Sequence, residues 1–532
     1  MLFQSPEFLG WFLPAVVVIY FALGRTGRTA PLSWLVAASI FFYAWWIPAH
    51  LPILLGSLLV NHFLARKICT RPAQPVFGLG VLLNLALLGY FKYAWFIAEN
   101  AAWLAGADWS WPRVILPLGI SFFTFQQIAF LADCQARIIE DPPPLLDYAL
   151  FVTFFPQLIA GPIVHHKEMM GQFEREETFR PRASNLAAGL TCFAIGLFKK
   201  VVIADSLAVT ADTAFAAAGE GVPVQVLTAW TGAIAFTFQI YFDFSGYSDM
   251  ALGLARIFGI DLPLNFASPF KSHNIIEFWR RWHTSLTRFF VGYLYSPMVL
   301  RLTRARVSRG HPLNRRGRTT PGNFFFLLTL PTLLTMFLIG VWHGAGYQFA
   351  VFGLMHGFFL VTNHGFRAIR PTWLKPSRAG AALSVAFTFL CVVVSLVYFR
   401  ADTLAEAWTL TRGLVGLNGL ALPGVAKAPL AALGIGEGSW LTFGTSLMRV
   451  DDLVFALSPL PLVWLLPNTQ QWMHTAAIGT DRTDPALQPG LLRWIGPWRP
   501  TPAGAVVVSL LLGLALSKVV SSAPSRFLYF NF

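Results

Sequence analysis

Apolar stretches long enough to cross a lipid bilayer dominate this sequence. A hydrocarbon core about 30 Å thick requires about 20 residues of α-helix, and such runs recur along the whole 532 residues. They predict about 11 crossings, near 8–24, 31–49, 51–65, 76–97, 185–204, 224–242, 323–341, 347–365, 380–399, 452–467 and 503–520. The pattern is typical of an all-α polytopic membrane protein.

Two more apolar stretches, 114–132 and 145–163, contain proline and glycine. We expect them to be re-entrant segments that enter the membrane and turn back. Broken backbone at membrane depth is tolerated only where it is buried in protein or lines a cavity. These stretches are therefore expected to be buried in protein or to line a cavity.

The composition agrees with a membrane location. Hydrophobic residues make up 55% of the chain and charged residues 12%, whereas about 25% of the residues of a soluble domain are charged. These values exclude a soluble domain and a disordered chain, and the four cysteines contain no close pair that would indicate a disulfide scaffold.

The net charge of +14 has a topological explanation. Cytoplasmic loops of membrane proteins collect Lys and Arg, so nucleic acid is not needed as a partner. Basic residues follow the first and third predicted crossings, and seven arginines lie between 301 and 318. We place these loops in the cytoplasm and the N-terminus outside. The residues are Arg25, Arg28, Arg66, Lys67, Arg71, Arg301, Arg304, Arg306, Arg309, Arg315, Arg316 and Arg318.

We expect a single integral-membrane domain over 1–532. The first apolar segment lacks the basic region of a cleavable signal peptide, because Glu7 is the only charged side chain before Arg25. One segment differs in composition: 413–447 is rich in Gly, Ala, Leu and Pro. It predicts a loop or interfacial insertion with a short helix.

Polar side chains inside apolar runs are functional candidates in a membrane protein. The stretch 237–250 contains Asp243 and Asp249, six residues apart, which is about 240° of helix rotation. The two carboxylates would face different ways unless the chain turns at Gly246. One interpretation is a cation or proton site. The other, which we favour, is that both carboxylates satisfy backbone groups or arginines at a break in the helix.

The stretch 269–289 mixes arginines with aromatic residues. It is typical of an amphipathic interfacial helix whose arginines reach toward the headgroups. His283 lies within this polar and aromatic patch, between Trp282 and Thr284. Taken alone, it is more often structural than catalytic.

His343 ends an apolar run and is followed by Gly344 and Gly346. Glycine lets a ligand or another backbone approach closely, so the imidazole could border an open tunnel. With an unperturbed pKa of about 6.5, histidine exchanges protons near neutral pH. The alternative is a helix-terminal histidine bonded to a carbonyl, and both interpretations stay open.

No metal site is expected. On one continuous helix His343 and His356 would be about 20 Å apart along the axis and rotated by about 220°, so they could not share an ion. The sequence has no HExxH motif and no pair of closely spaced cysteines. It also lacks the GxSxG, Walker A and GxGxxG signatures of soluble enzymes.

Taken together, several blocks resemble the membrane-bound O-acyltransferase (MBOAT) family. The similarity is to its bacterial branch, which includes the membrane subunit of alginate O-acetylation and the D-alanyl transfer protein of teichoic acid modification. The blocks occur in family order over most of the chain: PLGISFFTFQQIAFLAD (117–133), FFPQLIAGPI (154–163), KKVVIAD (199–205), FDFSGYSDMALGLARIFGIDLPLNF (242–266), FWRRWHTSL (278–286) and VWHGAGYQFAVFGLMHG (341–357).

The resemblance implies a fold, a reaction and a site. The fold would be a ring of helices around a thinned core with a central tunnel. His343 would correspond to the family's catalytic histidine and act as general base, and His283 would polarise the thioester carbonyl or stabilise the oxyanion. Substrate-binding candidates in the same blocks are Asp243, Trp279, Arg281, Trp282, Trp342 and His356.

The resemblance also implies the substrates and the location. Acetyl-CoA or another acyl-CoA would be the cytoplasmic donor, with no bound cofactor. The acceptor would be an exopolysaccharide or cell-wall polymer, reached directly or through a periplasmic SGNH-type partner, and the protein would lie among the lipids of a bacterial inner membrane. The arginines between 301 and 318 would attract CoA phosphates, although cytoplasmic topology alone explains them.

Two other functional classes remain. A transporter or channel would use Asp243, Asp249 and the broken segments as a substrate path. A non-catalytic membrane anchor of a polymer-export complex would need none of the histidines.

Overall fold

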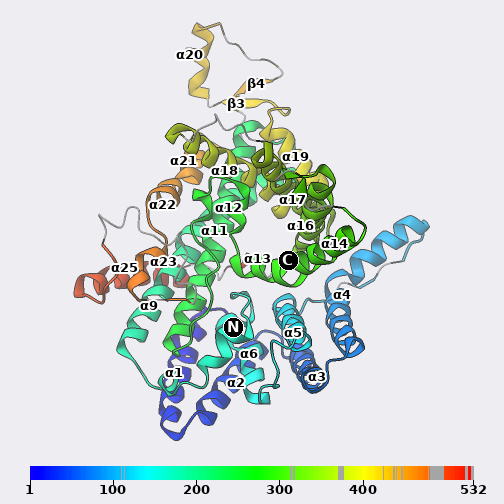
Figure 1. The fold of residues 1–532 in the computed structure, drawn as a ribbon. Coiled ribbons are helices and arrows are strands. Elements are labelled where there is room, and N and C mark those ends of the chain that lie inside the picture. The colour runs from blue at the N-terminus through cyan, green and yellow to red at the C-terminus, as the bar shows by residue number, and fades with distance from the viewer. Residues whose placement is uncertain are drawn as a thin grey trace.

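The computed structural model describes residues 1–532 except 110, 113, 312–313, 316–317, 370–376, 423, 435, 437, 439, 445–446, 477, 480–495, 522–524, 526 and 529–532. Helices make up most of the described chain (Figure 1). The prediction of an all-α polytopic membrane protein is therefore confirmed.

The N-terminal half begins with four helices and continues through shorter ones to a long central pair. Their bounds are α1 (Leu13–Leu23), α2 (Thr29–Ala44), α3 (Leu51–Thr70), α4 (Gln74–Ala105), α5 (Ile120–Gln135), α6 (Leu145–Thr153), α7 (Phe155–Leu158), α8 (His166–Met169), α9 (Ala183–Phe198), α10 (Asp205–Gly219) and α11 (Val226–Ile257). A π-helical turn, Lys199–Ala204, joins α9 to α10.

The C-terminal half contains the blocks with the candidate histidines. Its helices are α12 (Ile275–Trp279), α13 (Thr284–Phe290), α14 (Ser296–Ser308), α15 (Pro321–Phe324), α16 (Leu330–His343), α17 (Tyr347–Ile369), α18 (Arg378–Arg400), α19 (Leu404–Leu414), α20 (Lys427–Ala432), α21 (Val450–Leu457), α22 (Leu460–Leu465), α23 (Thr469–Trp472) and α25 (Pro502–Ser521).

Nine helical segments among the described residues are long and apolar enough to cross a membrane. They are Phe8–Thr26, Pro48–Thr70, Gln74–Ala105, Ala183–Gly219, Pro321–His343, Tyr347–Ile369, Arg378–Arg400, Val450–Ala476 and Pro502–Ser521. Two predicted crossings fall outside this set. The first, 31–49, forms α2, whose 16 residues span only about 24 Å. The second, 224–242, forms the first half of α11, whose other half contains Asp243, Asp249 and Arg256.

The two stretches expected to be re-entrant differ from each other. The stretch 145–163 is broken, because the helix stops at Phe154 and resumes in the four-residue α7. In 114–132 the chain instead forms one continuous helix, α5, which starts after Gly119 in a left-handed conformation with φ of 70°. Twelve of the sixteen residues of α5 are buried, so this stretch packs within the protein.

Helix α11 packs against α9 and α10, and Figure 1 shows α9 beside it. From Ala229 to Ala255 every residue of α11 is buried except Trp230, which is half-buried. Glycines let α9 approach closely: a Cβ added to Gly253 would lie 2.7 Å from the backbone N of Phe193, and one added to Gly246 would lie 2.7 Å from the carbonyl oxygen of Gly196. Small residues at such contacts are typical of helix packing in membranes.

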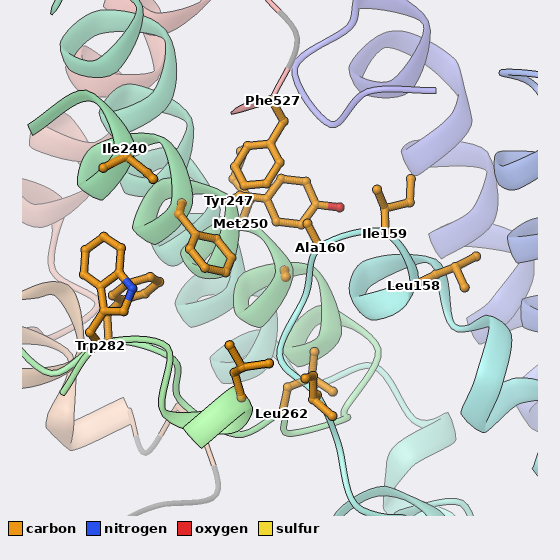
Figure 2. Close-up of a cluster of buried hydrophobic side chains, with 14 of the residues drawn as sticks. Leu158, Ile159, Ala160, Ile240, Tyr247, Met250, Leu262, Trp282 and Phe527 are labelled. Carbon is orange, nitrogen blue, oxygen red and sulfur yellow. The ribbon is translucent and has the colours of Figure 1, made fainter. Parts of the chain in front are cut away.

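Segments far apart in sequence meet on α11, as Figure 2 shows around Tyr247. The rings of Phe527 and Phe3 lie 4.6 and 4.8 Å from the ring of Tyr247. The side chain of Gln4 donates to the carbonyl oxygen of Ser525 at 2.7 Å. Phe3 near the start of the chain and Phe527 near its end are thus both packed inside the protein.

The segment 413–447 projects from one end of the molecule (Figure 1). It contains the short helix α20, as predicted, and two strands that the sequence did not indicate. Strand β3 (Leu420–Leu422) pairs in parallel with β4 (Leu441–Phe443). A second short pair, β1 (Asn314–Arg315) and β2 (Arg318–Thr319), lies in the arginine-rich loop.

Candidate active site

His343 is the last residue of α16 and lies inside the protein, with 5% of its surface exposed. Its ring centroid lies 4.7 Å from that of Trp342 and 4.9 Å from that of Phe399. The helix stops there because Gly344 is extended, and a Cβ at Gly344 would collide with the ring of Phe349. The imidazole is therefore enclosed by aromatic rings at a helix end.

His283 directly precedes α13 and has a left-handed backbone, with φ of 45° and ψ of 54°. For a non-glycine residue this conformation costs about 1–2 kcal/mol, and such strain is found at functional sites. Backbone pairing holds the residue in place: Ala267 donates to the carbonyl oxygen of Arg281 at 3.0 Å, and Thr284 donates to that of Asn265 at 3.1 Å.

The side chain of Asn265 sets the tautomer of His283. Nδ1 of His283 lies 3.3 Å from Oδ1 of Asn265, and this amide oxygen can only accept, so Nδ1 carries the proton. The same oxygen accepts from the hydroxyl of Ser285 at 2.6 Å. In the neutral ring, Nε2 of His283 then has a lone pair and acts as an acceptor.

Trp342 lies beside both histidines. The ring centroid of Trp342 is 6.4 Å from that of His283. The ring of Trp342 also stacks on the ring of Phe125, with the centroids 5.5 Å apart. Among the described residues, its buried indole N–H has no hydrogen-bond acceptor. The structure therefore brings His343, His283 and a neutral N–H donor together, although the histidines are 60 positions apart in the sequence.

Trp279 and His356 form a separate buried network. The indole N–H of Trp279 donates to Nδ1 of His356 at 3.2 Å. Nε2 must then carry the proton of the neutral ring, and it lies 2.9 Å from the hydroxyl of Ser395. Both ring nitrogens of His356 bond to protein groups, which favours a structural role for this residue.

His343 and His356 lie on two different helices, α16 and α17, whereas the sequence-based distance between them holds for one continuous helix. The chain turns between α16 and α17, which pack against each other, and both rings contact Phe352, at 6.0 and 4.7 Å. Among the described residues, no group of three or more His, Cys, Asp or Glu side chains is arranged to hold a metal.

The prediction of one amphipathic helix over 269–289 is wrong. The chain forms two short helices, α12 and α13, because the left-handed residue His283 turns the backbone between them. Trp282 is buried and stacks on Phe278 at 5.6 Å. Arg281 pairs with Glu277 at 2.6 Å, so its charge is compensated on the surface of this turn.

The favoured interpretation of Asp243 and Asp249 is right in that the protein compensates both carboxylates, Asp243 partly through a backbone N–H, but it is wrong in two respects. Helix α11 continues without a break through Gly246, because this glycine serves close packing rather than a turn. The partners are also lysines rather than arginines. Lys200 pairs with Asp243 and Lys199 with Asp249, each at 2.6 Å.

The two adjacent lysines, at the start of the π-helical turn, reach carboxylates on different faces of α11. The backbone N–H of Leu528 also donates to Asp243, at 3.0 Å, and Gln470 donates to Asp249, at 2.5 Å. Among the described residues, these pairs favour a structural role over a transport path, since both carboxylates are compensated.

A polar cavity of about 950 Å³ borders this region. Its wall includes Gly344, the residue after His343, and Lys92 of α4. Charged residues of α10 and α18 line another part, and two of these pair with each other: Arg400 and Asp212, at 2.8 Å. The cavity is large enough to hold a sugar unit or an extended peptide next to the end of α16.

Three residues that support the site are not among the residues predicted from the sequence: Lys92, Asn265 and Lys200. Lys92 could have been noticed as a charge within the predicted crossing 76–97, which is a functional signal. Lys200 follows a long apolar run and carries the same signal. Asn265 lies in a loop, and no sequence pattern connects it to His283.

Comparison with known proteins identifies similar chains. Residues 69–309 match the model of the MBOAT, membrane-bound O-acyltransferase family. The peptidoglycan O-acetyltransferase of Helicobacter pylori is 37% identical, covering 100% of this chain and 98% of that protein. The probable alginate O-acetylase AlgI of Pseudomonas aeruginosa is 36% identical, covering 82% and 79%. The teichoic acid D-alanyltransferase of Bacillus subtilis is 28% identical, covering 51% and 65%.

Proposed function

This chain belongs to the membrane-bound O-acyltransferase family and is a multi-pass membrane O-acetyltransferase, and we propose that it delivers an acyl group from cytoplasmic acyl-CoA to hydroxyls of a cell-surface polymer. The names of the relatives support a polymer acceptor, because they refer to peptidoglycan, alginate and teichoic acid. The acyl group is acetyl or a similarly short chain. The location that fits this reaction is a bacterial inner membrane, with donor and acceptor on opposite sides.

One observation carries the proposal: His343 is buried at the end of α16, and the next residue, Gly344, lines a polar cavity. A buried imidazole beside a cavity in a membrane protein can receive a hydroxyl that enters from one side and a thioester that enters from the other. His343 then takes the proton of the acceptor hydroxyl as general base. The hydroxyl oxygen attacks the acyl carbon, and the C–S bond breaks to release CoA, whose thiolate recovers the proton from the imidazolium.

The developing oxyanion needs a hydrogen-bond donor. Neutral His283 does not supply one at Nε2, since Asn265 directs its proton to Nδ1. The indole N–H of Trp342 is a neutral donor beside both histidines. We therefore assign oxyanion stabilisation to Trp342 and propose that His283 accepts a hydrogen bond from a substrate group.

Delivery to the polymer requires a route beyond the membrane. A periplasmic SGNH-type acyltransferase is the partner that we propose to receive the acyl group and pass it on, with direct transfer as the simpler alternative. The arginines between 301 and 318 would attract CoA phosphates by charge at the cytoplasmic side.

The test is a His343→Ala variant expressed in a host from which the wild-type gene has been removed. The expected result is loss of acetyl groups from the surface polymer while the protein reaches the membrane at normal level. Acetyl groups released by mild base are measured separately in peptidoglycan and exopolysaccharide fractions, which identifies the acceptor.

His50→Ala is the matched control, because His50 lies in a short turn before α3, away from α16. It should leave acetylation unchanged. Acetylation that persists in His343→Ala would exclude the catalytic role. Purified protein in proteoliposomes with labelled acetyl-CoA on one side tests the donor, and flux of solutes without consumption of acetyl-CoA would indicate a transporter instead.

A further inference from the structure

The C-terminal end of α16 lies inside the protein, where Trp342 and His343 are buried and Gly344 lines the polar cavity. The last carbonyl groups of any helix lack donors within that helix, and at membrane depth other protein groups must supply them. In α16 the last three of these are the carbonyls of Val341, Trp342 and His343, and Gly344 N–H reaches back to Val341, at 3.2 Å. Another element must therefore supply the remaining donors.

Two adjacent residues of α4 supply them. The ammonium group of Lys92 donates to the carbonyl oxygen of Trp342 and, at 3.0 Å, to that of His343. The hydroxyl of Tyr93 donates to the carbonyl oxygen of Val341 at 2.8 Å. Three successive carbonyls are thus held by a helix about 250 residues earlier in the chain.

The positive charge of Lys92 interacts with the carbonyl groups at the end of α16. The residue is 6% exposed, so its ammonium group cannot reach the membrane surface as a long side chain at a helix end would. No carboxylate among the described residues pairs with it, and its Nζ lies 5.8 Å from the centroid of the Trp342 ring. The partial negative charge at the C-terminus of α16 is what stabilises this cation.

The same contact places Lys92 at the reacting centre. Lys92 and Gly344 both line the polar cavity, and the two carbonyls bonded to the ammonium group belong to Trp342 and His343. Hydrogen bonds from a charged donor are shorter and stronger than neutral ones. They fix the last turn of α16, and with it the directions in which the imidazole and the indole N–H point.

We propose that Lys92 is a positioning residue for the reaction: its ammonium group, with the hydroxyl of Tyr93, closes the end of α16 and fixes His343 and Trp342 against the cavity. This inference rests on the proposed function, in which His343 is the general base. A merely structural lysine would affect the amount of folded protein. A positioning lysine affects the turnover of the protein that has folded.

The test compares Lys92→Met, Lys92→Gln and Lys92→Arg in proteoliposomes. For Lys92→Met, kcat should fall at least tenfold while KM for acetyl-CoA stays within twofold. Lys92→Arg should recover at least a third of kcat, because a guanidinium group can bond to two carbonyls. Lys92→Gln, with one amide donor group, should lie between them, and it keeps the test decisive if Lys92→Met does not fold.

Tyr93→Phe removes only a neutral bond and should lower kcat less than Lys92→Met. Tyr90→Phe, an exposed position on the same helix, is the control and should match the wild type. A second readout needs no acetyl transfer: hydrogen exchange of the peptide 338–346 should become faster in Lys92→Met.

Unchanged kcat and unchanged exchange in Lys92→Met, alongside an inactive His343→Ala, would overturn this inference alone. An active His343→Ala would overturn the proposed function instead.

Discussion

The indole N–H of Trp342 is a donor whose acceptor is expected to be a substrate atom. The ring is held by its aromatic neighbours, including Phe125 and Phe122, and its carbonyl is held by Lys92. A fixed donor in a water-excluded site stabilises developing charge without having to reorganise. The bond would be made to the oxyanion, so its effect should appear in kcat.

Trp342→Phe tests this role, because it keeps an aromatic ring and removes the N–H. Loss of one oxyanion donor typically lowers kcat by about a hundredfold or more, and we expect about that loss with little change in protein level. Initial rates of acetyl transfer by the purified variant are the measurement. The control is Trp45→Phe, at a position 47% exposed, and an active Trp342→Phe enzyme would refute the assignment.

The buried ion pair between Lys200 and Asp243 supports the site through stability rather than chemistry. Lys200 and Asp243 are almost inaccessible, with side chains 3% and 1% exposed, and Lys200 also reaches Asp205 at 2.7 Å. Removing one partner of such a pair leaves an uncompensated buried charge, which costs about 3–5 kcal/mol. These groups therefore belong to the framework that supports the site.

At the scale of elements, close helix contacts determine where the site residues lie. Helices α9 and α11 approach through glycines on both, and α16 and α17 do the same: a Cβ at Gly340 would lie 2.9 Å from the Cα of Gly353. Without a hydrophobic driving force between helices in lipid, packing of small residues holds them together. The contact between α16 and α17 places His343 and His356 against the same phenylalanine.

Gly253→Ala tests the central contact. Its Cβ would lie 2.7 Å from the backbone N of Phe193, and backbone atoms cannot yield as a flexible side chain does. We expect a marked loss of folded protein, measured as the monodisperse fraction after detergent extraction and by the melting temperature. Gly78→Ala is the control, since a Cβ at Gly78 meets nothing within 4 Å. Equal yields of the two variants would contradict the packing argument.

At the scale of the whole molecule, contacts place the basic loops after α1 and α3 together, beside the segment 137–147. Arg28 pairs with Asp147 at 2.6 Å, and Arg137 donates to the carbonyl oxygen of Cys69 at 2.8 Å. Tyr20, near the end of α1, donates to the carbonyl oxygen of Phe258, just after α11. The 413–447 segment contacts the opposite end of α11, where Val226 donates to the carbonyl oxygen of Gly419 at 3.0 Å.

This arrangement, together with the cytoplasmic location expected for the arginine-rich loop, predicts the topology. A cysteine introduced at Ser308, which is exposed after the arginines of α14, should react with a membrane-impermeant thiol reagent only from the cytoplasmic side. A cysteine at Ala431, on α20, should react only from the outside. Labelling of intact cells and of inverted vesicles is the measurement, and the same sidedness for both positions would contradict the assignment.

The sequence by itself determined the class of the protein, most of the membrane crossings and the location of both candidate histidines. These properties depend on local sequence. A run of apolar residues must form a helix in lipid, and a histidine within a family motif can be recognised from the residues next to it. The sequence placed His343 at a helix end because the glycines that follow it signal that end.

Only the tertiary structure decided how these residues are connected. It showed that Lys92 holds the end of α16, that Asn265 orients His283, and that lysines of a π-helical turn compensate Asp243 and Asp249. The physical reason is that a buried polar group in a membrane must be satisfied by protein, and its partner can come from any part of the chain. Sequence distance therefore says nothing about the pairing, and helix packing decides it.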